Sequence, residues 1–144
     1  MYTYQYPRPA VTVDIVILST IDGQPHILLV ERRNAPFAGC WALPGGFVDE
    51  NEDLGDAAAR ELLEETNLKC TGLRQFGAFG KPGRDPRGHT ITIVYWGFAD
   101  NPQQACAGDD AKNLRWFQID RLPPLAFDHD AVIAAGLSAA GLAR

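Results

Sequence analysis

The chain has 144 residues, of which 46% are hydrophobic and 22% are charged, and its formal net charge at pH 7 is -5. These values exclude a wholly disordered chain and predict one compact domain over residues 1–144. A negative net charge also argues against a nucleic-acid partner, because such proteins usually present a basic face to the phosphates. An anionic substrate would therefore need a metal ion or a local group of arginines.

The N-terminus, the apolar runs and the cysteines indicate a cytoplasmic protein with no membrane partner. The first ten residues lack the basic and then apolar pattern of a signal peptide, and the apolar run at residues 131–143 is too short to span a bilayer. The cysteines form no CxxC pair, which argues against a disulfide framework and against a zinc site.

The first half of the chain predicts two antiparallel strands and then a loop. Residues 10–19 are rich in β-branched side chains, and residues 26–32 follow a turn at Asp22 and Gly23. Residues 34–46 are rich in proline and glycine and are expected to form a loop, which leads into a short strand around Phe47 and Val48.

The remaining elements complete an α/β pattern. A helix is expected from Asp53 to Thr66, followed by strands at residues 70–79, 90–99 and 114–119 and a closing helix at residues 127–142. An irregular loop is expected at residues 81–89. Several strands around one early and one late helix predict a mixed sheet that is covered by helices.

The helix expected at residues 53–66 separates into two faces at 100° per residue. The apolar arc contains Gly55, Ala58, Ala59, Leu62 and Leu63. The opposite arc, expected to face solvent, contains Asp53, Arg60, Glu61, Glu64 and Glu65.

The three glutamates of this arc repel one another at their spacing, which makes a plain acidic surface costly. A divalent cation reverses that repulsion, because Mg²⁺ binds hard oxygen ligands together with water and substrate phosphates. The pattern therefore indicates a site for Mg²⁺, with Mn²⁺ as the alternative ion, more than a solvated acidic face.

This segment closely resembles the Nudix box, which reads glycine, five residues, glutamate, seven residues, Arg-Glu-apolar, one residue, Glu-Glu, one residue and Gly-apolar. The matching residues are Gly46, Glu52, Arg60, Glu61, Leu62, Glu64, Glu65 and Leu68. Asn67 stands where the family has glycine. Asparagine tolerates the left-handed conformation well, so we expect Asn67 to end the helix in that conformation.

Segments outside the box are similar to bacterial ADP-ribose pyrophosphatase-like members of the Nudix family. They are residues 34–48, 83–90, 107–111 and 125–129. The resemblance implies an α/β/α sandwich with a central mixed β-sheet. It also implies Mg²⁺-dependent hydrolysis of the pyrophosphate bond of a nucleoside diphosphate derivative, with ADP-ribose giving AMP and ribose 5-phosphate.

The resemblance also implies roles for the residues of the box. Glu61, Glu64 and Glu65 would bind the metal, and the carbonyl of Gly45 or Gly46 would complete the site. Glu52 would act through water or from a second layer around the metal, and Arg60 would hold the carboxylates in place. The general base stays open between Glu64, Glu65, Asp109 and Asp110.

Three arginines outside the box are candidates for binding the substrate. The forked guanidinium groups of Arg84 and Arg87 match phosphate oxygens, and Arg33 is the third candidate. His26, His89 and His129 lack metal-binding spacing and are expected to have surface or structural roles. The expected partner is a small nucleotide, and a homodimer is left open.

Two other functions compete with ADP-ribose hydrolysis. One is a house-cleaning pyrophosphohydrolase of oxidised or other nucleoside triphosphates. The other is a module that binds ADP-ribose or another nucleotide without cleaving it, as in regulators of this family that carry a C-terminal winged helix. Because the chain ends at Arg144 and keeps the carboxylates of the box, we expect an enzyme.

Overall fold

A computed structural model describes residues 1–108 and 111–142. In these residues the strands are β1 (Ala10–Ile21), β2 (Gln24–Arg32), β3 (Trp41–Ala42), β4 (Gly45–Phe47), β5 (Arg74–Phe79), β6 (Thr90–Phe98) and β7 (Ala111–Gln118). The helices are α1 (Leu54–Thr66) and α2 (His129–Ala139), and a 3-10 turn η1 spans Pro102–Gln104. None of these helices combines the length and the apolar character that a bilayer span requires.

Strand β1 is the centre of a mixed sheet in which the path of neighbouring strands is β3-β2-β1-β6-β5. It pairs with β6 in parallel and with β2 antiparallel, and β6 pairs antiparallel with the edge strand β5. Strand β7 pairs with β2. The predicted antiparallel pair and the mixed sheet are confirmed.

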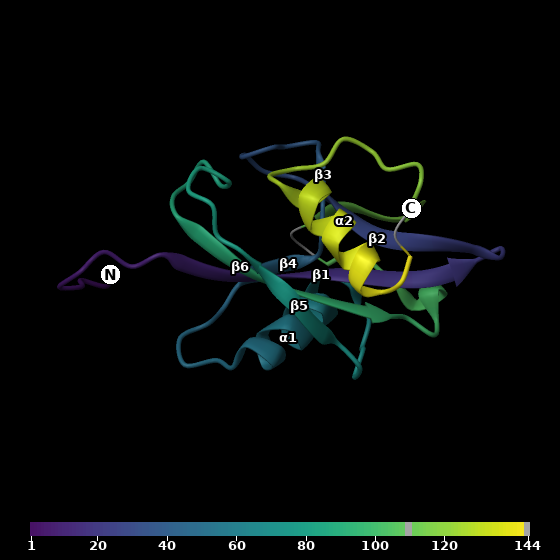
Figure 1. Cartoon of the computed structure of the whole chain (residues 1–144), viewed down its shortest axis with the longest axis horizontal. Helices are drawn as coiled ribbons and strands as arrows, with labels where there is room; N and C mark the ends of the chain where they lie inside the picture. The colour runs from purple at the N-terminus through teal and green to yellow at the C-terminus, as the bar shows by residue number, and fades with distance from the viewer. Residues whose placement is uncertain (109–110, 143–144) are drawn as a thin grey trace.

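The alternation of side chains along β1 builds a core on each face of the sheet. Val13, Ile15 and Ile17 pack with Ala58 and the rest of the apolar side of α1. Val16 and Leu18 pack on the other face with α2. Figure 1 shows α1 and α2 lying against the long strands, and together with the two cores it gives the predicted α/β/α sandwich.

Strand β1 changes partner along one of its edges, which opens the sheet. Its far half, Leu18 to Ile21, pairs with β2, whereas its near half pairs with β4, with Asp14 opposite Gly45. The rest of β2 runs away from β1 and pairs with β7. The two strands diverge where Asp14 lies, and the short strand β4 enters there and leads on to α1.

The sequence predicts the elements well and their ends less well. The expected strand at residues 70–79 begins only at Arg74, because its pairing with β6 starts there, opposite Trp96. The expected loop at residues 34–46 contains β3 and the start of β4. The closing helix is shorter at both ends than predicted, spanning His129–Ala139.

The predicted solvent face of α1 is wrong in one respect. Glu61 is buried, with a relative exposure of 9%, whereas Leu63 of the predicted apolar arc is 40% exposed. The reason lies in the neighbouring strand β4. Gly46 has no side chain there, and a Cβ on it would lie 2.6 Å from the carboxylate of Glu61. The helix therefore turns a carboxylate, and not only apolar groups, toward the sheet.

Helix α1 is capped at both ends: Asp53, which was expected to be the first helical residue, is the N-cap, and Asn67 is the predicted C-terminal cap. The carboxylate of Asp53 accepts a hydrogen bond from the Leu54 N–H at 2.9 Å. Asn67 has φ 62 and ψ 12, and its N–H donates to the Leu63 carbonyl. This is the left-handed C-terminal cap in which glycine and asparagine are favoured, so the conformation expected for Asn67 is confirmed.

We predict that Asn67→Gly changes the free energy of unfolding by only about a few tenths of a kcal/mol, whereas Asn67→Val lowers it by about 1 kcal/mol or more. The β-branched side chain is strained at positive φ, and glycine is not. Denaturant unfolding of both variants beside the parent chain measures the difference. Equal stability of the glycine and valine variants would contradict the assigned cap.

Candidate active site

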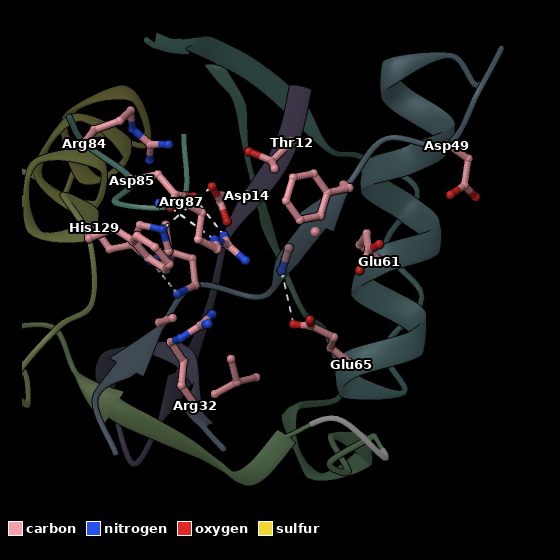
Figure 2. A pocket seen from close by; sticks show the side chains of 17 residues that line it. Thr12, Asp14, Arg32, Asp49, Glu61, Glu65, Arg84, Asp85, Arg87 and His129 are labelled. Atoms are coloured by element: carbon pink, nitrogen blue, oxygen red, sulfur yellow. Dashed lines mark hydrogen bonds and ion pairs between the residues drawn. The ribbon is translucent and has the colours of Figure 1, made fainter. Parts of the chain in front are cut away.

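The divergence of β1 and β2 opens into a cleft of about 460 Å³. Figure 2 shows Glu61 and Glu65 of α1 on one side of this cleft and Arg32, Arg84 and Arg87 on the opposite side. Asp14 and His129 are drawn near Arg87, and we call this part of the lining the floor of the cleft. We call the two sides the carboxylate wall and the arginine wall.

The two glycines of β4 bring the backbone against the carboxylate wall. The N–H of Gly45 donates to Oε2 of Glu65 at 3.1 Å. A Cβ on Gly46 would overlap the Glu61 carboxylate, and a Cβ on Gly45 would overlap the Val13 carbonyl and Oδ1 of Asp14. These contacts explain the glycine pair, because a side chain at either position would collide with the β1 backbone or with a carboxylate of the cleft.

Arg60 binds the outer side of the carboxylate wall. It forms two hydrogen bonds with Glu52, at 2.8 and 2.9 Å, and one with Oε1 of Glu61 at 2.9 Å. It also reaches Glu64 at 3.2 Å and the carbonyl of Phe47 at 3.1 Å. One guanidinium therefore joins three of the predicted site carboxylates to the backbone of β4.

Glu61 is the member of this group with the most unusual environment. Burial raises its pKa, and the hydrogen bond from Arg60 opposes that rise. A buried carboxylate at the edge of an open cleft is costly unless a positive charge neutralises it. Arg60 supplies that charge from one side, and the cleft lies on the other.

In the described residues, no three His, Cys, Asp or Glu side chains already converge as a metal cage. The donor set nevertheless fits Mg²⁺ or Mn²⁺, because Mg²⁺ needs only one or two carboxylates when water and substrate phosphates supply the remaining oxygens. Glu61 and Glu65 both line the cleft, and Gly46 leaves space for a close approach to the backbone. These hard oxygen groups are the candidates to hold the ion.

The arginine wall contains charges that are already ordered by partners. Arg87 binds Asp85 through two guanidinium nitrogens, at 3.1 and 2.8 Å, and this bond lowers the pKa of Asp85. The Arg87 guanidinium also lies 5.3 Å from the ring of Phe47 and 5.5 Å from that of Phe127. Its side chain is still 44% exposed, so an anion can reach it.

The other predicted arginines lie in less accessible positions. Arg84 lines the cleft, but its guanidinium is only 5% exposed and binds Asp128 at 2.6 and 2.9 Å. Arg33 lies outside the main cleft, in an adjoining pocket that Glu65 also lines, and donates to the carbonyl of Ala111. Among the three candidates, the structure exposes Arg87 most clearly to a ligand in the cleft.

Two further predictions concern the general base. Glu64 is 58% exposed, contacts Arg60 and does not line the cleft, whereas Glu65 does. Asp109 and Asp110 lie outside the described residues. Glu65 is therefore better placed than Glu64 to meet a ligand.

Several cleft residues were missed from the sequence. Arg32 ends β2 and faces the cleft, and the floor contains Asp14 and His129. His129 was expected to have a surface or structural role, yet it is buried and lines the cleft. One sequence signal was available for Asp14, because an aspartate interrupts the apolar stretch of β1 where a core residue is expected.

The mixed sheet between two helices, with the box residues lining a cleft, defines a hydrolase of the Nudix class. A family profile of the NUDIX domain matches residues 8–136, so the chain belongs to the Nudix family. The ADP-ribose pyrophosphatase of Methanocaldococcus jannaschii is 44% identical over 128 residues, which are 89% of this chain and 73% of that protein.

Two other similar proteins are connected with ADP-ribose. The ADPR responsive transcriptional repressor NtrR of Acinetobacter baylyi is 38% identical over 128 residues, and the match covers 86% of this chain but only 51% of that protein. The NUDIX domain of Shewanella oneidensis NrtR, solved in complex with ADP ribose, has a TM-score of 0.88 and 32% identity. That match covers 94% of this chain and 90% of the other.

We predict a pH-dependent contribution of Glu52 to stability. Its hydrogen bonds with Arg60 lower its pKa from 4.5 to about 2. A lowered pKa in the folded state stabilises the fold at pH values above the unfolded value, and this stabilisation is lost as the pH falls toward the folded value. The melting temperature of Glu52→Gln should therefore lie below that of the parent at neutral pH, and the difference should shrink between pH 4.5 and about 2.

A second pair of variants isolates the contact. In an Arg60→Gln background, Glu52→Gln should change the melting temperature with a much weaker pH dependence, because only the Asp49 N–H then remains as a partner of the carboxylate. A pH-dependent difference that is undiminished without Arg60 would contradict this origin of the effect.

Proposed function

We propose that this Nudix hydrolase cleaves the pyrophosphate bond of ADP-ribose and releases AMP and ribose 5-phosphate, with Mg²⁺ as its metal and Mn²⁺ as the alternative. The observation that carries the proposal is the pair of facing walls in one cleft. The carboxylate wall offers oxygen ligands for a cation, and the arginine wall offers donors for phosphate oxygens.

The bound metal would neutralise charge on the diphosphate and lower the pKa of a water that it binds. Glu61 and Glu65 would hold it, with the backbone of Gly46 beside them and Arg60 fixing the orientation of Glu61. Glu64 and Glu52 would act from outside this set, since both bind Arg60.

The chain's own groups would position the reacting atoms. Water attacks one phosphorus, the bond between that phosphorus and the bridging oxygen breaks, and the proton of the water passes to a base. Glu65 is the proposed base among the described residues, because it lines the cleft and the Gly45 N–H holds its carboxylate. Arg87 would bind phosphate oxygens on the opposite wall, with Arg84 ordering the loop beside it and Arg33 supporting from the adjoining pocket.

The choice of ADP-ribose over other nucleotides rests on the cleft and on the relatives together. A volume of about 460 Å³ suits a dinucleotide-sized ligand, since ligand clefts commonly measure about 300–1,000 Å³. A pyrophosphatase and a transcriptional repressor similar to this chain are named for ADP-ribose, and the similar NUDIX domain of NrtR was solved in complex with ADP ribose. A nucleoside triphosphate pyrophosphohydrolase is the second candidate.

We predict that Glu65→Gln lowers the turnover of ADP-ribose by about 100-fold or more, as does the loss of one charge-stabilising group in other active sites. The amide keeps the shape and can still accept from the Gly45 N–H, so the fold should be retained. The measurement is release of AMP at saturating Mg²⁺. Asp120→Asn is the matched control, because it removes one negative charge from an exposed turn outside the cleft.

A substrate panel separates the candidate functions. ADP-ribose, NADH, diadenosine polyphosphates, sugar nucleotides and 8-oxo-dGTP should be compared with Mg²⁺ present, and the highest turnover is expected for ADP-ribose. Preferred turnover of 8-oxo-dGTP would favour the triphosphate pyrophosphohydrolase. Tight binding of ADP-ribose with no turnover of any nucleotide would favour a sensing module.

A further inference from the structure

We propose that Asp14 is a specificity residue, whose carboxylate oxygen Oδ1 accepts hydrogen bonds from ribose hydroxyls of the ligand in the cleft. This inference rests on the proposed function, because it states which group of the proposed substrate binds to Asp14. It concerns a buried carboxylate whose hydrogen-bond donor is Thr92 and not one of the arginines of the cleft. Figure 2 shows this side chain near Arg87 and His129.

Asp14 places a carboxylate on β1 where burial makes a charged group costly in free energy. On the same face of this strand, Val16 and Leu18 belong to the core beneath α2. Asp14 is only 8% exposed, and burial raises its pKa. A strand that otherwise builds a core gains nothing from a carboxylate here, since an apolar residue would pack without a desolvation cost.

One oxygen of the carboxylate is used within the protein. Thr92 lies on the adjacent strand β6 and donates its hydroxyl to Oδ2 at 2.6 Å. Nε2 of His129 lies 3.7 Å from the same oxygen. Both neighbours therefore approach Oδ2 and leave the other oxygen to a different partner.

The hydrogen bond at Nδ1 determines which nitrogen of the neutral His129 ring carries the proton. The backbone N–H of Leu43 donates to Nδ1 at 3.0 Å, so Nδ1 carries no proton. The hydrogen of the neutral ring must then sit on Nε2, which faces Asp14. Burial lowers the pKa of His129, in agreement with a neutral ring. The Nε2–H therefore faces Oδ2 at 3.7 Å, beyond hydrogen-bond distance, and the neutral ring does not neutralise Asp14 as a full ion pair.

The other oxygen, Oδ1, lies beside Gly45. A Cβ on that residue would overlap both Oδ1 and the Val13 carbonyl, so only glycine fits beside this oxygen. Within the described residues, none of the hydrogen bonds that reach Asp14 ends on Oδ1. Asp14 lines the cleft, so a ligand there can approach this oxygen.

The chemistry of a nucleoside diphosphate derivative points to ribose hydroxyls as the donors. The N–H of Gly45 holds Glu65 of the carboxylate wall, so Oδ1 lies next to the place proposed for the metal and the diphosphate. In ADP-ribose each phosphate is bonded to a ribose, and the base lies one sugar further away. Ribose hydroxyls can donate to the lone pairs of Oδ1, whereas phosphate oxygens would be repelled by it.

The test compares ligands with and without the hydroxyls, in EDTA and by calorimetry, so that binding is measured without turnover. The first pair is ADP-ribose and the methyl ester of ADP, which has no terminal ribose. The second pair is AMP and 2′,3′-dideoxy-AMP, which has no hydroxyls on the nucleoside ribose. In each pair, we divide the Kd of the ligand without the hydroxyls by the Kd of the ligand with them. For the wild type, this ratio measures how much the hydroxyls contribute to binding.

The main variant is Asp14→Asn. Thr92 donates its hydroxyl to Oδ2, so it should hold the amide oxygen at that position and leave the amide NH₂ at the position of Oδ1, where it cannot accept. We expect one of the two Kd ratios to fall by about tenfold or more, as the loss of a hydrogen bond to a charged acceptor implies. The pair that responds shows whether Oδ1 binds the terminal ribose or the nucleoside ribose.

Two further variants keep the result interpretable. Thr92→Val removes the internal hydrogen bond and keeps the carboxylate, so both Kd ratios should stay near the wild-type values. If Asp14→Asn fails to fold, Asp14→Ala takes its place, and the same fall in one of the two Kd ratios is expected. Wild-type ratios in every folded Asp14 variant would overturn the inference and leave the proposed function standing. A wild type that neither binds ADP-ribose in EDTA nor hydrolyses it with Mg²⁺ would overturn both.

Discussion

The close approach of the β4 backbone to the helix α1 is the constraint on which the rest of this site depends. Gly45 and Gly46 lie so near Asp14 and Glu61 that a Cβ on either would overlap a carboxylate. The missing side chains let α1 turn Glu61 toward the sheet and let the Gly45 N–H hold Glu65. The contact between β4 and α1 therefore determines how the helix is oriented on the sheet and where its carboxylates lie.

The charged side chains around this contact form two groups, one on each side of the cleft. Arg60 gathers Glu52, Glu61 and Glu64 on the outer side, where it limits their mutual repulsion without filling the cleft. Across the cleft, the pairing of Arg87 with Asp85 and of Arg84 with Asp128 holds guanidinium groups in place before a ligand arrives. Such preorganised charges lower the cost of ordering a site when an anion binds.

The sequence predicted the framework because local patterns determine it, and it missed contacts made between distant segments. The C-terminal cap of α1 follows from the tolerance of Asn67 for the left-handed conformation, and Asn67 ends the helix as expected. Helical periodicity could not show that Gly46 makes room for Glu61, since the two meet only through tertiary packing. In the same way, His129 and Asp14 are 115 residues apart in the chain, and only the fold of α2 over β1 brings them together.

The most direct test of this account is the location of a bound divalent cation. Titration of the protein with Mn²⁺ should broaden the amide NMR signals of Gly45 and Gly46, because a paramagnetic ion acts over short distances. The signal of Gly23, at the tip of the β1–β2 hairpin and roughly 30 Å along the strand from Asp14, should stay sharp. Broadening at both places, or at Gly23 alone, would contradict the claim that the glycine pair and α1 form the metal site.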